Sequence, residues 1–136
     1  MNTAVNQIAE TARPYALAAM RVVLGIVFVY HGWWKVMNFG LTVELFGKWG
    51  IPLPLPSAIA ATVLEVGGGI ALILGVGVAY LALPLAFTML VAIVYVHFAA
   101  GFGAPKGYEY PLTLLVAVLA QGASGPGARK CDCRQT

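Results

Sequence analysis

The sequence predicts an all-α integral membrane protein, a four-helix bundle with a short interfacial helix between its first and second spans. Three observations lead to this fold class. Of the 136 residues, 60% are hydrophobic and 10% are charged, whereas charged residues make up about a quarter of an ordinary soluble domain. Four apolar runs approach the ~20 residues that a spanning helix needs. The segment that joins the first two runs is too polar to cross a bilayer.

We expect the whole chain, 1–136, to form one membrane domain with spans at about 15–37, 57–75, 78–100 and 107–123 and a polar, basic tail at 124–136. Pro14 should begin the first helix, because proline suits a first helical turn. Ser57 should cap the second helix through its hydroxyl. The first fourteen residues lack the basic-then-apolar pattern of a cleaved signal, so the first span should remain in the mature protein.

The joining segment contains apolar side chains at helical spacing over residues 41–49, with Glu44 and Lys48 four residues apart. This pattern predicts a short helix that lies in the outer membrane interface. The prolines at 52, 54 and 56 are expected to return the chain in an extended conformation. In the second span, Gly67, Ala71 and Gly75 predict a ridge of small residues for helix packing.

Charge predicts the topology and the surroundings. Four crossings put both termini on one side, and basic residues are slightly more frequent there, which favours cytoplasmic termini in a bacterial inner membrane. We therefore expect contact with lipid and none with nucleic acid. Cys131 and Cys133 both lie in the tail, and two thiols are too few for a zinc site, so no metal is expected. The counted residues are Arg13, Arg129, Lys130 and Arg134 on one side and Lys35, Lys48 and Lys106 on the other.

Ionisable residues inside apolar spans are the strongest functional signal in this chain. A charge at the bilayer centre costs about 2.5–3.5 kcal/mol, so such residues mark candidate sites. Arg21, His31 and Lys35 follow one stripe of the first helix, which must face protein rather than lipid. A rise of 1.5 Å per residue separates Arg21 from Lys35 by about 21 Å, which places them at opposite ends of the span.

The other ionisable residues converge on the outer half of the bundle. His31 lies roughly 8 Å from the outer end of its span, Glu65 roughly 12 Å and His97 about 5 Å by the same rise. Lys35 and Glu109 lie at the outer ends of their helices. All four spans therefore contribute to one predicted site, in which Glu65 should contact His31 or Lys35.

Each of these residues also has a purely structural explanation. Lys35 can extend to the lipid headgroups, and Glu109 can complement the positive end of its own helix. Arg21 can anchor the inner leaflet, and His97 can lie at the interface with its ring nitrogens satisfied. The structural explanation is weakest for Glu65, because a short side chain at that depth cannot easily reach water.

Several segments, in their order and spacing, resemble the DoxX family of small bacterial membrane proteins. The resemblance covers nearly the whole chain, and Cys131 departs from it where members usually have serine. It implies a four-helix membrane protein and indicates membrane redox work, because one branch resembles the quinone-reducing subunit of thiosulfate:quinone oxidoreductase. Other members look like accessory subunits of membrane complexes. The matching pieces are Arg21, "HGWWK" at 31–35, "FGKWGIP" at 46–52, "EVGGGIALILG" at 65–75, His97, "GYEYPL" at 107–112 and "GPGARKCD" at 125–132.

The first functional hypothesis is a quinone-reactive subunit of a redox complex, with electrons supplied by a partner subunit. His31, Lys35 and His97 can donate hydrogen bonds to quinone carbonyls, and Glu65 can relay protons. We take Glu65, His31 and Lys35 as the candidate catalytic residues. The aromatic side chains of Trp33, Trp34 and Tyr95 can form the walls of the ring site. The candidate binding residues are His97, Glu109, Trp34, Tyr95 and Arg21.

Two other hypotheses remain open. A non-catalytic accessory subunit would use the same polar cluster to fix helix register while it binds and stabilises a larger membrane complex. A b-type haem held between His31 and His97 is the hypothesis that we favour least, because two histidines on different helices are common without haem. Transport is disfavoured for four short spans without an internal repeat.

Overall fold

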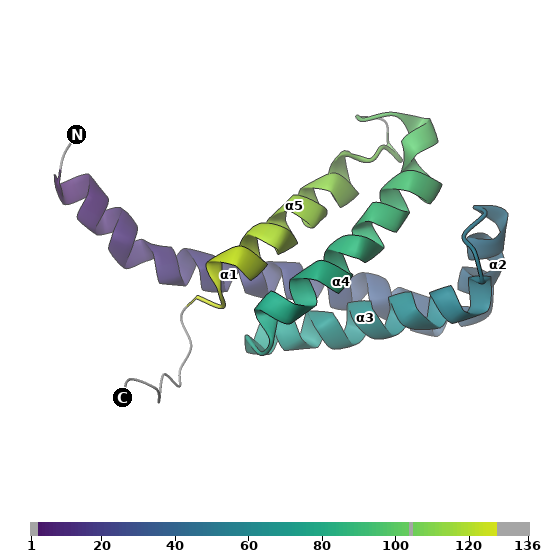
Figure 1. Ribbon diagram of the computed structural model, residues 1–136, viewed down its shortest axis with the longest axis horizontal. Helices are drawn as coiled ribbons and strands as arrows, with labels where there is room; N and C mark the ends of the chain where they lie inside the picture. Colours follow the sequence, from purple (N-terminus) through teal and green to yellow (C-terminus); the bar gives the residue numbers. More distant parts are fainter. Residues whose placement is uncertain (1–2, 104, 128–136) are drawn as a thin grey trace.

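The computed structural model describes residues 3–103 and 105–127, and in this part of the chain every regular element is helical (Figure 1). The α-helices are α1 (Thr3–Met37), α2 (Phe39–Lys48), α3 (Pro54–Leu74), α4 (Val78–Val91) and α5 (Glu109–Ser124). A π-helical turn, η1 (Ala92–His97), and a 3-10 turn, η2 (Phe98–Ala100), extend α4. The prediction of an all-α fold is confirmed, and so is the short helix between the first two spans.

Three helices of the described chain are long and apolar enough to cross a membrane: Thr3–Met37, Pro54–Leu74 and Val78–Ala100. The protein is therefore a membrane protein. The 16 residues of α5 rise only about 24 Å, which is less than the ~30 Å of a bilayer core. With five α-helices and three candidate spans in the described residues, the predicted four-helix bundle is not confirmed.

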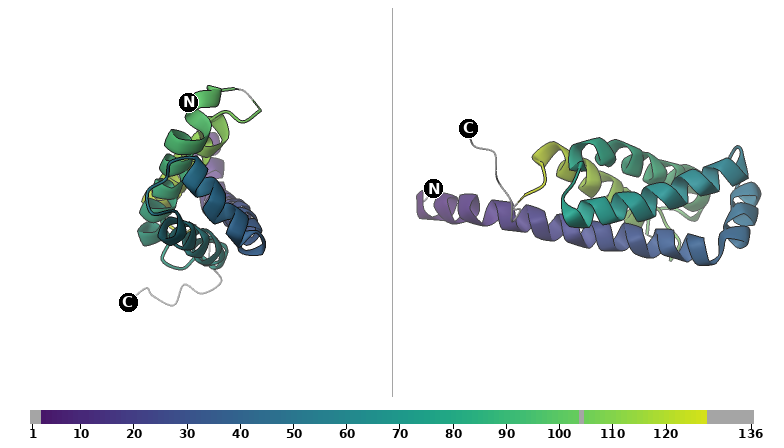
Figure 2. Two further views of the ribbon diagram at one scale, coloured as in Figure 1. Left: turned by 90° about the vertical axis from the view of Figure 1, so that its right-hand side faces the viewer. Right: turned by 90° about the horizontal axis from the view of Figure 1, so that it is seen from below.

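The helices run back and forth as two packed pairs. α1 packs mainly on α3, and α4 packs mainly on α5, while contacts of α1 with α5 and of α3 with α4 join the pairs. Figure 2 shows α2 at one end of the molecule and the beginning of α1 and the end of α5 toward the other. The turn between α3 and α4 also lies at the end away from α2, so the loop after α4 returns to the end that carries α2.

The first helix begins earlier than predicted. Pro14 lies inside α1, which already starts at Thr3. Proline has no N–H to donate to the carbonyl four residues before it, but residues 3–13 are exposed, so water can satisfy that carbonyl. The helix therefore continues through Pro14 instead of starting there.

The third helix also begins before its predicted cap. α3 starts at Pro54, because Pro54 and Pro56 fall in the first turn, where backbone N–H groups have no partner in the helix. The extended return thus ends at Leu53, whose φ of 50° is left-handed. The Ser57 hydroxyl lies inside the helix and donates to the carbonyl of Pro52 at 2.7 Å instead of capping the helix.

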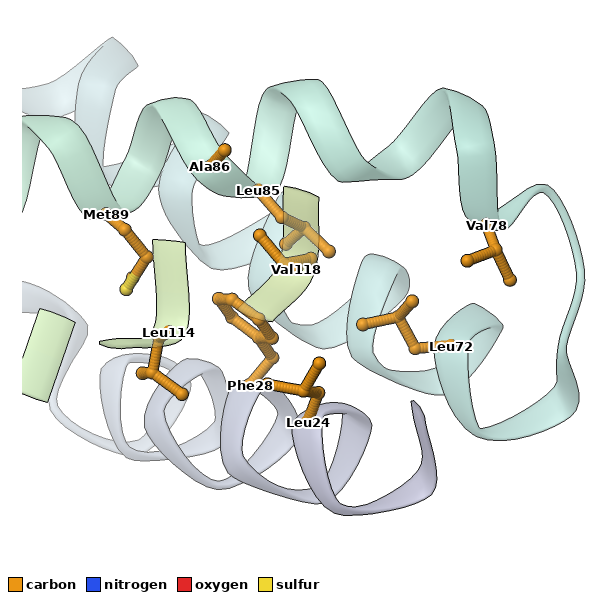
Figure 3. Close-up of a cluster of buried hydrophobic side chains, with 9 residues drawn as sticks. All are labelled: Leu24, Phe28, Leu72, Val78, Leu85, Ala86, Met89, Leu114 and Val118. Atoms are coloured by element: carbon orange, nitrogen blue, oxygen red, sulfur yellow. The ribbon is translucent and has the colours of Figure 1, made fainter. Parts of the chain in front are cut away.

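The main hydrophobic core lies where the two helix pairs meet. Figure 3 shows Phe28 of α1, which is 1% exposed, extending toward Val118 of α5. Because α1, α3, α4 and α5 each supply at least one core side chain, apolar burial holds the two pairs together. The core residues are Leu24, Phe28, Leu72, Val78, Leu85, Ala86, Met89, Leu114 and Val118.

Glycines allow α1 and α3 to approach closely, but at other positions than predicted. A Cβ on Gly25 would lie 2.6 Å from the carbonyl oxygen of Gly69, and a Cβ on Gly69 would lie 2.7 Å from the carbonyl oxygen of Gly25. A Cβ on Gly67 would meet nothing within 4 Å. The predicted small-residue ridge was therefore wrong at Gly67, because the buried face of α3 passes through Gly69, two residues later.

We predict that Gly69→Ala destabilises the protein and that Gly67→Ala does not. Both changes add the same helix propensity, but only the first forces a methyl group into the backbone of α1, at a cost of about 1–3 kcal/mol. Thermal unfolding in detergent, followed by circular dichroism, measures the difference. Equal midpoints for the two variants would contradict the close crossing.

Candidate functional site

The central polar contact is an ion pair between α1 and α3. Lys35 Nζ donates to Glu65 Oε2 at 2.5 Å, and the two side chains are 18% and 4% exposed. Gly32, one turn before Lys35, permits this approach, since a Cβ there would lie 2.9 Å from the Cβ of Glu65. The prediction that Glu65 contacts a basic residue of the first helix is confirmed. A carboxylate this deeply buried needs such a partner.

A cavity of about 540 Å³ lies beside this ion pair. Its walls are mainly apolar and include Phe28, Leu64, Met89 and Leu114. The ionisable residues among those that line it come from α1, α3, the π-helical turn η1, the loop that follows the α4 extension, and α5. They are His31, Lys35, Glu65, His97, Lys106 and Tyr110. The cavity thus combines apolar walls with a few polar groups, as small-molecule sites do.

His97 lies at the end of the π-helical turn η1. Its Nδ1 is 2.7 Å from the carbonyl oxygen of Lys106. A carbonyl can only accept, so Nδ1 carries the hydrogen in this contact. This bond ties the end of the α4 extension to the loop that leads into α5.

His31 lies on the opposite helix pair. The centre of its ring is 5.6 Å from that of Tyr30 and 6.1 Å from that of Tyr110. Trp34 also lines the cavity. Five of the residues predicted for the site therefore share one cavity: Glu65, His31, Lys35, His97 and Trp34.

The other three candidates lie outside the cavity. Arg21 is 5% exposed and donates through one guanidinium nitrogen to the carbonyls of Leu72, at 2.6 Å, and Ile73, at 2.8 Å. These carbonyls end α3, where the helix dipole favours a cation. Tyr95 and Glu109 are exposed and do not line the cavity. Trp33, predicted as a wall, is 56% exposed and does not line it either.

Two ionisable residues that line the cavity were not predicted. Tyr110 lies one helical turn before the buried Leu114 on α5, a spacing that could have identified it. Lys106 lies in a loop with no periodic pattern, so only the folded chain shows where it is. Thr42 and Thr88 line the cavity as well, but their hydroxyls donate to Asn38 and Leu85 carbonyls.

Among residues 3–103 and 105–127, no group of three or more His, Cys, Asp or Glu side chains could hold a metal ion. Cys131 and Cys133, with the rest of the predicted basic tail from residue 128, lie outside the described residues.

We predict that Lys35→Met lowers stability and that adding Glu65→Leu restores it. The single change leaves a buried carboxylate without its cation, which costs about 3–5 kcal/mol where a buried pair is broken. The double change replaces the pair with apolar side chains of similar volume. Unfolding midpoints in detergent measure both effects. If Lys35→Met were as stable as the parent protein, the ion pair would not contribute to stability.

The chain is similar to known membrane proteins along most of its length. The DoxX family model matches residues 16–98. The chain is 31% identical over 129 residues to the inner membrane protein YphA of Escherichia coli (strain K12), which covers 90% of this chain and 92% of the relative. It is 32% identical over 115 residues to the inner membrane protein YqjF of the same strain, with 82% and 85% covered.

A third relative is named for a class of reaction. The chain is 32% identical over 101 residues to the protein named "Putative oxidoreductase CatD" of Bacillus subtilis (strain 168), with 74% of each chain covered. No solved structure matches the chain. The family model spans more than half of the sequence, and the relatives match along most of their length. The chain therefore belongs to the DoxX family.

Proposed function

We propose that the chain is the membrane subunit of a redox complex and that its cavity binds a quinone. One observation carries the proposal: hydrogen-bond donors and a paired, buried carboxylate line a single apolar cavity. A quinone ring needs apolar walls, and its two carbonyls need donors. The volume of about 540 Å³ falls within the range of about 300–1,000 Å³ that is typical of small-molecule sites.

The residues of the cavity suit proton transfer. Reduction of a quinone to a quinol consumes two electrons and two protons, and we assign the electrons to a partner subunit. Lys35 can donate a hydrogen bond to a carbonyl while it stays bound to Glu65. The Glu65 carboxylate can take up and release a proton within this pair. The name of the Bacillus subtilis relative supports the redox class and says nothing of the substrate.

We also propose the arrangement in the membrane. In this proposal α1, α3, α4 with its extension and α5 all cross the bilayer as one domain, with α2 in the outer interface and both termini in the cytoplasm. The antiparallel order of these helices supports it. Two relatives are named as inner membrane proteins, which supports a bacterial inner membrane.

An accessory role is the second candidate, and the same ion pair favours it. A buried pair between α1 and α3 fixes their register, which would suit a subunit that only holds a larger complex together. The two roles make different demands on Glu65: proton transfer needs a group that titrates, whereas register needs the negative charge that pairs with Lys35.

Glu65→Gln separates the two roles. Glutamine keeps the shape and can still hydrogen-bond to Lys35, but it neither titrates nor carries the charge that pairs with Lys35. If Glu65 transfers protons, we expect quinone reduction per assembled complex to fall by about 10²–10⁴. If Glu65 only fixes helix register, complex yield should fall instead. Complex yield is measured beside quinone reduction, and Glu44→Gln, in the exposed pair of α2, is the control. Normal turnover per complex with reduced yield would refute the proton-transfer role and favour the accessory one.

Cysteine labelling tests the orientation. The sequence contains two cysteines, Cys131 and Cys133, and both follow α5. A membrane-impermeant maleimide should label them in inside-out vesicles and leave them unlabelled in intact spheroplasts. Labelling in spheroplasts alone would place the C-terminus outside and reverse the proposed topology.

A further inference from the structure

The ionisable residues that line the cavity include more cations than anions. Lys35 is neutralised by Glu65, and the remaining ionisable groups on the wall are Lys106, two histidines and a tyrosine. Within residues 3–103 and 105–127, the ion pairs closer than 4 Å are Lys35–Glu65 and Lys48–Glu44. The acid nearest to Lys106 in the sequence, Glu109, is exposed and does not line the cavity. Lys106 thus supplies a cation without a counter-charge from this part of the chain.

The loop that carries Lys106 is built tightly. The N–H of Tyr108 donates to the carbonyl of Gly101 at 3.1 Å, and the N–H of Glu109 donates to that of Phe102 at 3.2 Å. These bonds bring the backbone so close that a Cβ on Gly107 would lie 2.1 Å from the oxygen of Phe102. Only glycine fits there.

Aromatic packing braces the same loop. The ring of Tyr108 stacks on Phe98, with centres 5.9 Å apart, and meets Phe102 edge-on at 5.4 Å. The His97 ring holds the loop through the carbonyl of Lys106 itself. These contacts hold the backbone of Lys106 at the edge of the cavity, and its exposed side chain extends from there.

We propose that the cavity selects a quinone whose ring carries an ionised hydroxyl group, with Lys106 as the cation that recognises it. This inference rests on the proposed function. The ionised oxygen lies at Lys106, the ring lies among the apolar walls, and a ring carbonyl accepts from Lys35. Lys106 is exposed at the edge of the cavity, so water partly screens the attraction between the two charges. A neutral quinone of the same size leaves Lys106 without this interaction.

The test compares two ligands of similar size on the full chain in detergent. 2-Hydroxy-1,4-naphthoquinone is ionised at neutral pH, whereas 2-methyl-1,4-naphthoquinone is neutral. Binding is followed by quenching of tryptophan fluorescence, since Trp34 and Trp49 line the cavity. Ala60→Phe places a larger side chain on the cavity wall to block binding. The quenching that remains in this variant measures quinone dissolved in the micelle.

Three lysine variants locate the effect. Lys106→Gln removes the cation, and Lys106→Arg keeps it. Lys48→Gln is the matched control, because Lys48 is paired with Glu44 at 2.6 Å and does not line the cavity. We expect the hydroxyquinone to bind about threefold more tightly than the neutral quinone, the size expected of a charge pair with an exposed lysine. Lys106→Arg and Lys48→Gln should keep this preference, and Lys106→Gln should abolish it.

Every other result contradicts a specific part of the proposal. Equal affinities in the parent protein would remove the charge selection and leave the quinone site standing. A preference that survives in Lys106→Gln would remove Lys106 from recognition. If neither quinone quenches more than in Ala60→Phe, the proposed function itself fails. Displacement of the hydroxyquinone by laurate at equal concentration would assign the site to anionic lipids instead of quinones.

Discussion

The structure depends on the cost of burying Glu65 in an apolar helix. A carboxylate that is 3% exposed needs a cation at bonding distance, and Lys35 supplies it from α1. That bond requires the two helices to cross closely, which Gly25, Gly32 and Gly69 permit because a side chain at any of them would collide with the other helix. The pairing of α1 with α3 and the place of the polar site therefore follow from one constraint.

The second helix pair completes the cavity without contributing to the ion pair. α4 and α5 pack on each other and meet the first pair through the core around Phe28. The α4 extension then changes to a π-helical turn that ends at His97. Such turns are frequent at functional sites, and here the turn brings an imidazole and the loop with Lys106 to the same cavity as Glu65. The polar groups of the cavity thus come from both helix pairs. Within residues 3–103 and 105–127, the ion pair among them joins α1 to α3.

The apolar runs, together with the free-energy cost of placing a charge in the membrane, were enough to predict much of the site. Glu65, His31, Lys35, His97 and Trp34 were identified from depth and helical spacing, and they share one cavity. The same reasoning could not exclude Arg21, Tyr95 and Glu109, because depth along a helix does not specify which way a side chain faces. Helix starts were missed for a related reason. Proline and serine signals at Pro14 and Ser57 are local, and local signals give way where water or a neighbouring turn satisfies the backbone.

The sequence by itself determined that this is an all-α membrane protein of the DoxX family with a costly carboxylate in an apolar helix, because composition and charge burial depend little on how helices are arranged. Tertiary structure alone decided which glycines form the α1–α3 crossing and that Lys106 lies at the edge of the cavity. These facts depend on rotation about helix axes and on a loop closed by long-range hydrogen bonds, and neither leaves a periodic pattern in the chain.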